Sequence, residues 1–189
     1  MSSTTTKVSA RHALEEAFFR DVDEMIVRRL KSDADSEKAR RELIQSTGLH
    51  DKTLIDELSQ LGVSAEGLIA LRLVPLVMVA WADQGVDQSE RQAVIAQALR
   101  VGVIDGSVAA VLLEHWLNHK PPARILDAWK RYMSSELASM SKVAKERLIA
   151  LMEVQMTAVA TSSGGHFGIG RVSAKEQQLI DMMTHVLRK

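Results

Sequence analysis

Cysteine is absent from the 189 residues, which excludes disulfides, thiolate metal sites and a cysteine nucleophile. A chain without cysteine fits a reducing compartment. There is also no excess of charge, because 24 lysine and arginine residues balance 24 aspartate and glutamate residues. No net field therefore attracts polyanions, and we expect no nucleic-acid partner.

Long apolar runs are missing as well. The longest run, 73–82, is far shorter than the roughly 20 residues that a transmembrane helix needs. The first ten residues, MSSTTTKVSA, lack the apolar core of a signal peptide. We therefore expect no transmembrane segment and a cytoplasmic location.

Apolar residues make up 46 % of the chain, which is the usual share for a globular protein with a full core. They recur at spacings of three and four, and no stretch alternates with the period of two that marks a strand. We predict an all-α bundle of about eight or nine helices. We expect a disordered tail in 1–7, N-terminal accessory helices in 8–62 and a helical domain in 63–189.

Short oxygen-bearing side chains mark the expected helix starts, because they accept hydrogen bonds from the first free amides. They are Asp35 or Ser36, Asp51, Ser64, Asp87, Ser107, Ser141 and Ser173. We predict one central helix from Ser64 to Trp81, apolar nearly all round and kinked at Pro75. The helix after Asp87 has its predicted apolar face at Val94, Ile95, Ala98 and Leu99.

The stretch from Leu73 to Leu99 contains an apolar helix, an acidic turn and a helix that begins with a capping box. In such a box the cap accepts from the third amide, and a glutamate there reaches back to the cap amide. Asp87 and Glu90 have this spacing, and Ser173 and Glu176 repeat it 86 residues later. The repetition predicts two similar helix-turn-helix halves.

The first of these turns, Ala82-Asp83-Gln84-Gly85-Val86-Asp87-Gln88-Ser89-Glu90, resembles the Ala-Asp-Gly-x-Ile-Asp-x-x-Glu turn of the tellurite-resistance TerB-like family. The resemblance covers about residues 68–187. It implies an all-helical fold with an internal repeat, and it places Asp83, Asp87 and Glu90 on proposed cation-binding positions. The glycine is displaced by one position here, and the second copy has Thr161 and Ser173 where acids are expected.

Asp83, Asp87 and Glu90 supply hard oxygen ligands of the kind that calcium, magnesium and manganese prefer. The simpler interpretation is a capping box beside a solvated aspartate. The loop is short for calcium, and the EF-hand spacing of aspartates is absent.

His115 and His119 are four residues apart, which is a spacing that could hold zinc on one helix face. The sequence suggests no third ligand, and a histidine near a helix C-terminus also suits the helix dipole. The glycine-rich stretch 162–170 matches no phosphate-binding motif and is interpreted as a surface loop.

These patterns predict a non-catalytic interaction or scaffold protein, and no catalytic arrangement stands out. The family resemblance adds a bacterial stress response or a membrane-associated assembly as the setting, with another protein as the partner. The alternative is a divalent-cation-binding protein that uses the acidic turn 83–90. A small metal-dependent hydrolase at His115 and His119 is the third hypothesis, and it requires a third ligand and an adjacent pocket.

Overall fold

The computed structural model describes residues 21–83, 85–162 and 172–189, and these residues form an all-α fold without strands. Residues 21–34 are helical. The elements that follow are α2 (Glu37–Thr47), α3 (Lys52–Gln60), the 3-10 helix η1 (Ala65–Gly67), α4 (Leu68–Arg72), α5 (Val74–Ala80), α6 (Gln88–Arg100), α7 (Val108–Asn118), α8 (Ala123–Ala138), α9 (Lys142–Ala160) and α10 (Ala174–Arg188). The all-α prediction is confirmed.

Side-chain caps start most of these helices where the sequence predicts them. The capping residues that accept from a backbone amide three positions later are Ser36, Asp51, Asp87, Ser107, Ser141 and Ser173. Ser64 precedes η1 but makes no such hydrogen bond. Helix starts are predictable here because the cap and the amide that it satisfies lie within one turn of chain.

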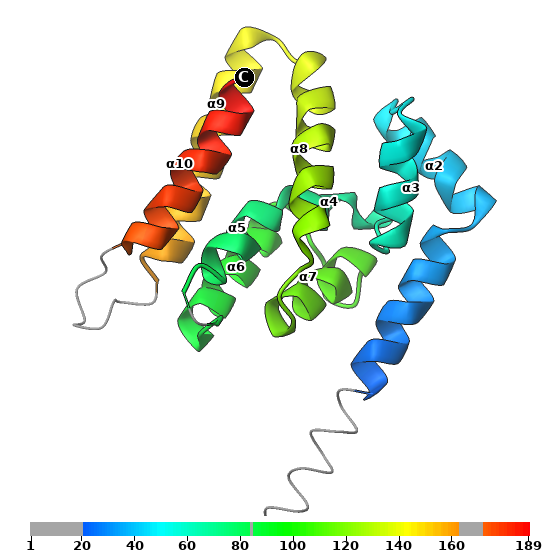
Figure 1. The fold of residues 1–189 in the computed structure, drawn as a ribbon, viewed down its shortest axis with the longest axis horizontal. Coiled ribbons are helices and arrows are strands. Elements are labelled where there is room, and N and C mark those ends of the chain that lie inside the picture. The colour runs from blue at the N-terminus through cyan, green and yellow to red at the C-terminus, as the bar shows by residue number, and fades with distance from the viewer. Residues whose placement is uncertain (1–20, 84, 163–171) are drawn as a thin grey trace, which may run out of the picture.

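Helix α5 is the centre of the molecule. It packs against α4, α6, α7, α8, α9 and α10, and six of its seven residues are buried. Figure 1 shows α9 and α10 on one side of the fold and α2 and α3 on the other, with α8 between them. A helix that is apolar all round can be stable only in such a fully enclosed position.

The single kinked helix predicted over 64–81 is wrong, because the structure divides this stretch into η1, α4 and α5. The helix is interrupted at Leu73, which lies between α4 and α5, and Pro75 is in the first turn of α5. A backbone N–H in the first turn has no acceptor within the helix, so a proline at that position costs no helical hydrogen bond. The proline therefore starts a new helix instead of bending a continuous one.

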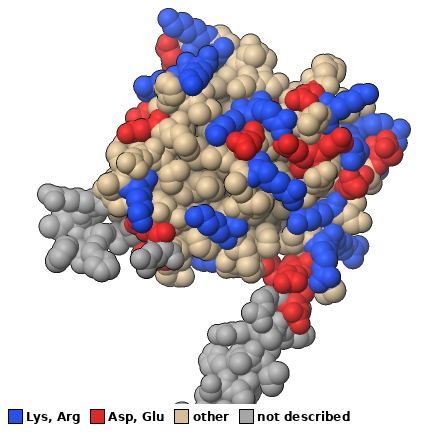
Figure 2. Space-filling model, viewed as in Figure 1, with Lys and Arg blue, Asp and Glu red and all other residues tan. Residues whose placement is uncertain are grey.

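The helices before residue 62 pack on this core. Helix α2 contacts α3 and η1, and α3 contacts α8. Leu43, Leu54 and Leu58 are buried in the same apolar cluster as α5 and α9. Arg131 of α8 pairs with Glu57 of α3. On the face in Figure 2, basic and acidic side chains are interspersed.

The two predicted helix-turn-helix units are α5–α6 and α9–α10. Helices α5 and α9 pack against each other, α6 packs on α9, and α10 packs on α5. Each unit therefore contributes one central helix and one helix that covers the other unit.

Three stretches with sequence predictions lie outside the described residues, namely the tail 1–7, the start of the accessory helices at 8–20 and most of the glycine-rich stretch 162–170. Within the part of the chain that is described, no helix has both the length and the apolar composition needed to cross a bilayer.

Candidate functional site

The predicted acidic turn joins α5 to α6. Asp87 is the N-cap of α6, and its Oδ1 accepts from the Glu90 amide at 2.8 Å. In return, the Asp87 amide donates to Glu90 Oε2, also at 2.8 Å. Asp83 Oδ1 lies 3.9 Å from Lys175 Nζ, at the start of α10. The capping box is therefore present, and two of the carboxylates use one oxygen each to build it.

Glu90 is buried although it is a carboxylate, with only 5 % of the residue exposed. Burial raises its pKa to about 7, and the charges of Asp87, Glu176 and Asp83 act in the same direction. The hydrogen bond from the Asp87 amide opposes this shift. The pseudo-symmetry brings the capping glutamates of both halves into one electrostatic neighbourhood.

Glu176 is the corresponding residue of the second half and is 2 % exposed. Its Oε2 accepts from the Ser173 amide at 2.6 Å, whereas its Oε1 is buried and has no hydrogen-bond partner among the described residues. A buried carboxylate oxygen without a donor is costly. This oxygen is the feature of the acidic region that the capping box does not explain.

A second group of polar side chains forms where α7 ends. His115 Nδ1 lies 3.1 Å from Asp23 Oδ2, and His119 Nδ1 lies 3.3 Å from the same oxygen. The two imidazole ring centroids are 4.9 Å apart. Among the described residues, only these three bring their ligand atoms within 4.8 Å of one another as a potential metal-binding group.

The sequence suggested no third ligand for the histidine pair, and the structure places Asp23 beside both histidines. Asp23 lies 92 positions before His115 in the chain, so no local spacing indicates the contact. Only the packing of segment 21–34 beside α7 brings them together. Glu114, the acid next to His115, pairs instead with Arg91 of α6 at 2.7 Å.

An apolar groove lies between segment 21–34, α6 and α7, and its volume is about 560 Å³. We call it the α6–α7 groove. Its apolar lining consists of Ile26, Ile95, Ala98, Leu99, Val103, Ala110, Val111 and Leu113, and its acidic lining of Asp23, Asp105 and Glu114. No lysine or arginine of the described chain lines it.

The predicted apolar face of α6 is only partly buried in the structure. Val94 and Ala98 are buried as expected, but Ile95 is 38 % exposed and Leu99 is 61 % exposed. Apolar periodicity identifies a helix face without showing what covers it. Half of this face packs on the core, and the other half opens into the groove.

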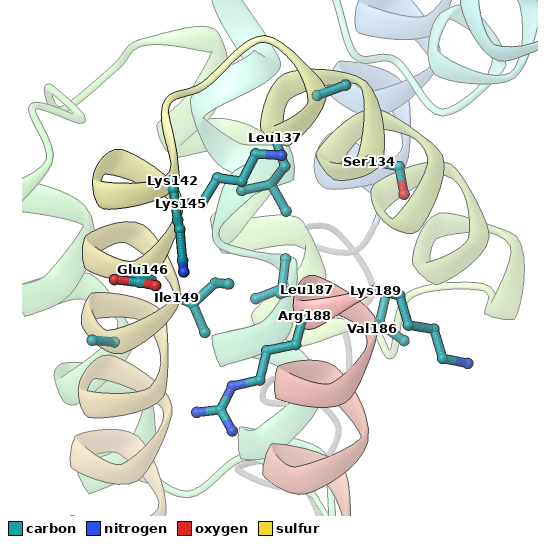
Figure 3. Close-up of a pocket in the computed structure, with 12 residues that line it drawn as sticks. Ser134, Leu137, Lys142, Lys145, Glu146, Ile149, Val186, Leu187, Arg188 and Lys189 are labelled. Carbon is teal, nitrogen blue, oxygen red and sulfur yellow. The ribbon is translucent and has the colours of Figure 1, made fainter.

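Another hollow lies between the ends of α8, α9 and α10 and has a volume of about 690 Å³. Figure 3 shows Lys142 and Lys145 of α9 and Arg188 of α10 around Ile149 and Leu187, whereas Lys189 points away from them. Arg188 also approaches Glu153 at 3.4 Å. The hollow combines cationic side chains and Glu146 with an apolar floor.

The three tryptophans belong to the apolar core or pack against it. Trp116 and Trp129 are buried. Trp81 is partly buried and donates from Nε1 to the Trp116 carbonyl at 2.8 Å. This hydrogen bond joins the end of α5 to α7, beneath the histidine pair.

Comparisons of the chain with protein-family models, with curated proteins and with solved structures found no match.

Proposed function

We propose that this protein is a non-catalytic interaction module and that the α6–α7 groove is its binding surface. One observation carries the proposal. Nine large apolar side chains are exposed in the described chain, and Ile26, Ile95 and Leu99 of these line the groove. Met25 and Ile104, which are also exposed, directly neighbour lining residues in the sequence. Concentrated apolar exposure of this kind is typical of interaction sites.

The occupant that fits this groove is an amphipathic helix of a partner protein, with basic residues beside its apolar face. The floor is apolar and the charged lining is acidic, so an apolar stripe flanked by lysine or arginine is complementary to it. We further propose that the partner belongs to a stress-response or membrane-associated assembly. This part of the proposal rests only on analogy with the TerB-like family.

Two synthetic peptides test this proposal. Both form amphipathic helices with the same leucine face, and one has lysines and the other glutamates on the polar face. We expect the lysine peptide to bind at least about 10-fold more tightly, as measured by fluorescence anisotropy. The double variant Ile95→Ser with Leu99→Ser should weaken that binding about 10-fold or more, because it removes apolar contact area.

The matched control is Leu151→Ser with Val154→Ser, which changes two exposed apolar residues of α9. This control should bind the lysine peptide as the wild type does. Equal affinity for the two peptides, or equal losses in both double variants, would overturn the proposal. Self-association that only the groove variant abolishes would identify a second copy of the chain as the occupant and would also overturn it.

The second candidate function is divalent-cation binding at Asp83, Asp87 and Glu90. The buried, unpartnered Oε1 of Glu176 favours it, because a cation near Glu90 would compensate two buried carboxylates at once. Calcium, magnesium and manganese are the fitting ions.

Thermal melting in EDTA and then in excess calcium, magnesium or manganese tests this second candidate. Binding at one hundred times the dissociation constant adds about 2.7 kcal/mol, or roughly 5–11 °C in Tm. Asp87→Asn with Glu90→Gln keeps side-chain oxygens that can form the capping box but removes both charges, so it should abolish the shift. Unchanged melting of the wild type in all three cations would refute cation binding here.

A further inference from the structure

We propose that Asp23, His115 and His119 form a binding site for a divalent transition metal, with zinc as the best-fitting ion. The two imidazoles point their Nδ1 atoms at one carboxylate oxygen, at 3.1 and 3.3 Å. Three potential ligand atoms from two separate parts of the chain therefore converge on one point. Asp23 also lines the α6–α7 groove, so the site adjoins that groove, but metal binding here does not depend on peptide binding there.

The distances suit a tetrahedral ion. With zinc–ligand bonds of about 2.0–2.1 Å, neighbouring ligand atoms of a tetrahedron lie about 3.3 Å apart. The two oxygen–nitrogen separations, 3.1 and 3.3 Å, are close to this value, and the three atoms all lie within 4.8 Å of one another. The side chain of His119 is 46 % exposed, so it has room to rotate and close the remaining edge.

The backbone explains why the two histidines act together. His115 lies in the last turn of α7, and His119 is the C-cap of this helix, one turn further on. Side chains four residues apart in such a position project from the same face. Asp23 approaches this face from segment 21–34, and its side chain is 24 % exposed. The ligands are thus accessible to an ion from solvent without being freely solvated.

The ligand types select the metal. Two imidazoles and one carboxylate suit zinc and other late divalent ions, whereas calcium and magnesium prefer oxygen-only sites. Three protein ligands leave a fourth position for water. Arg91 of α6 is paired with Glu114, the neighbour of His115 in the chain, and is hydrogen-bonded to Asn118. Glu114 therefore partly compensates the positive charge of Arg91.

Titration of the full chain with cobalt(II) after treatment with EDTA tests the site. Tetrahedral cobalt gives visible absorption bands, and these bands disappear when zinc displaces the cobalt. We expect one equivalent of cobalt to bind and zinc to replace it. Asp23→Asn and His119→Gln should each weaken binding by more than about 100-fold, because even outer-shell partners of a metal are worth 10- to 100-fold. Both residues are partly or well exposed, so these variants are expected to fold, which circular dichroism checks.

The control variant is His185→Gln, which changes an exposed histidine of α10 and should leave the cobalt spectrum unchanged. The proposal is overturned if the wild type gives no tetrahedral bands at equimolar cobalt. It is equally overturned if Asp23→Asn and His119→Gln both retain the wild-type spectrum and affinity, because the ion would then be bound elsewhere.

Discussion

The turns α5–α6 and α9–α10 have the same hydrogen-bonded motif but a different distribution of charge. Asp87 with Glu90 and Ser173 with Glu176 both form complete capping boxes, and both glutamates are buried. The first turn surrounds its glutamate with carboxylates, whereas the second uses a neutral serine as its cap and has Lys175 beside it.

This difference shows that a capping motif determines where a helix starts but not the electrostatics around it. The hydrogen bonds of the box depend on side-chain oxygens, which aspartate and serine both supply. The ionisation of the buried glutamate depends instead on every charge that packing brings near. In this fold the neighbours of Glu90 include Glu176, from the other half.

Among the variants that test this difference between the two turns, removal of the Glu90 charge should change the stability most with pH. A glutamate has a pKa near 4.5 when it is unperturbed, and that of Glu90 is about 7 in the folded protein. The folded state therefore binds the Glu90 proton more tightly than the unfolded state does. The stabilisation of the folded state by this proton is complete below pH 4.5 and is lost as the pH rises through 7. Glu90→Gln should raise Tm at pH 8 by roughly 2–4 °C, or about 1 kcal/mol, because the amide carries no charge.

At pH 4.5 the same substitution should change Tm little, because Glu90 is already protonated there. Glu146→Gln, on the exposed surface of α9, serves as the control and should be neutral at both pH values. Equal effects of Glu90→Gln at pH 4.5 and pH 8 would contradict the assignment of a raised pKa to this carboxyl.

Removal of the caps gives a smaller pH-dependent change in stability and a more selective test. Asp87→Ala and Ser173→Ala should each cost about 1 kcal/mol at pH 5, because each deletes one capping acceptor. Between pH 5 and pH 8 the cost of Asp87→Ala should fall by about 0.5 kcal/mol, since ionised Glu90 is then relieved of a neighbouring charge. Ser173 carries no charge, so the cost of Ser173→Ala should change less.

Urea unfolding at the two pH values measures these differences through the transition midpoint. The interaction of the Asp87 charge with the helix dipole is the same at both pH values, so it cancels in the comparison. Identical pH dependence for the two cap variants would show that the charges around Glu90 have no measurable effect on stability.

Helix class, most helix starts and the repeated capping boxes were predictable from the sequence because they depend on contacts within one or two turns. Ser36, Asp51 and Ser141 each cap the helix that follows them within a few residues. The break at Leu73 was missed because a proline is compatible both with a kink and with a first turn. Only the packing around α5 decides between them.

The candidate sites depended more strongly on tertiary structure. Asp87 and Glu90 lie on one turn, so their mutual hydrogen bonds could be predicted, whereas the proximity of Glu176 required both halves of the fold. Asp23 was missed as a partner of His115 because nothing in a single sequence links residues 92 positions apart. The exposure of Leu99 was missed because periodicity does not show which part of an apolar face stays uncovered.

The position of α5 has a consequence for synthesis on the ribosome. A seven-residue helix is too short to be stable alone in water, and α5 packs on α9 and α10, which are made later. A nascent chain that has emerged only as far as α8 therefore presents the apolar surface of α5 without two of its covering helices. The centre of this protein therefore cannot reach its full packing until α9 and α10 have been translated, and until then the apolar surface of α5 stays partly uncovered.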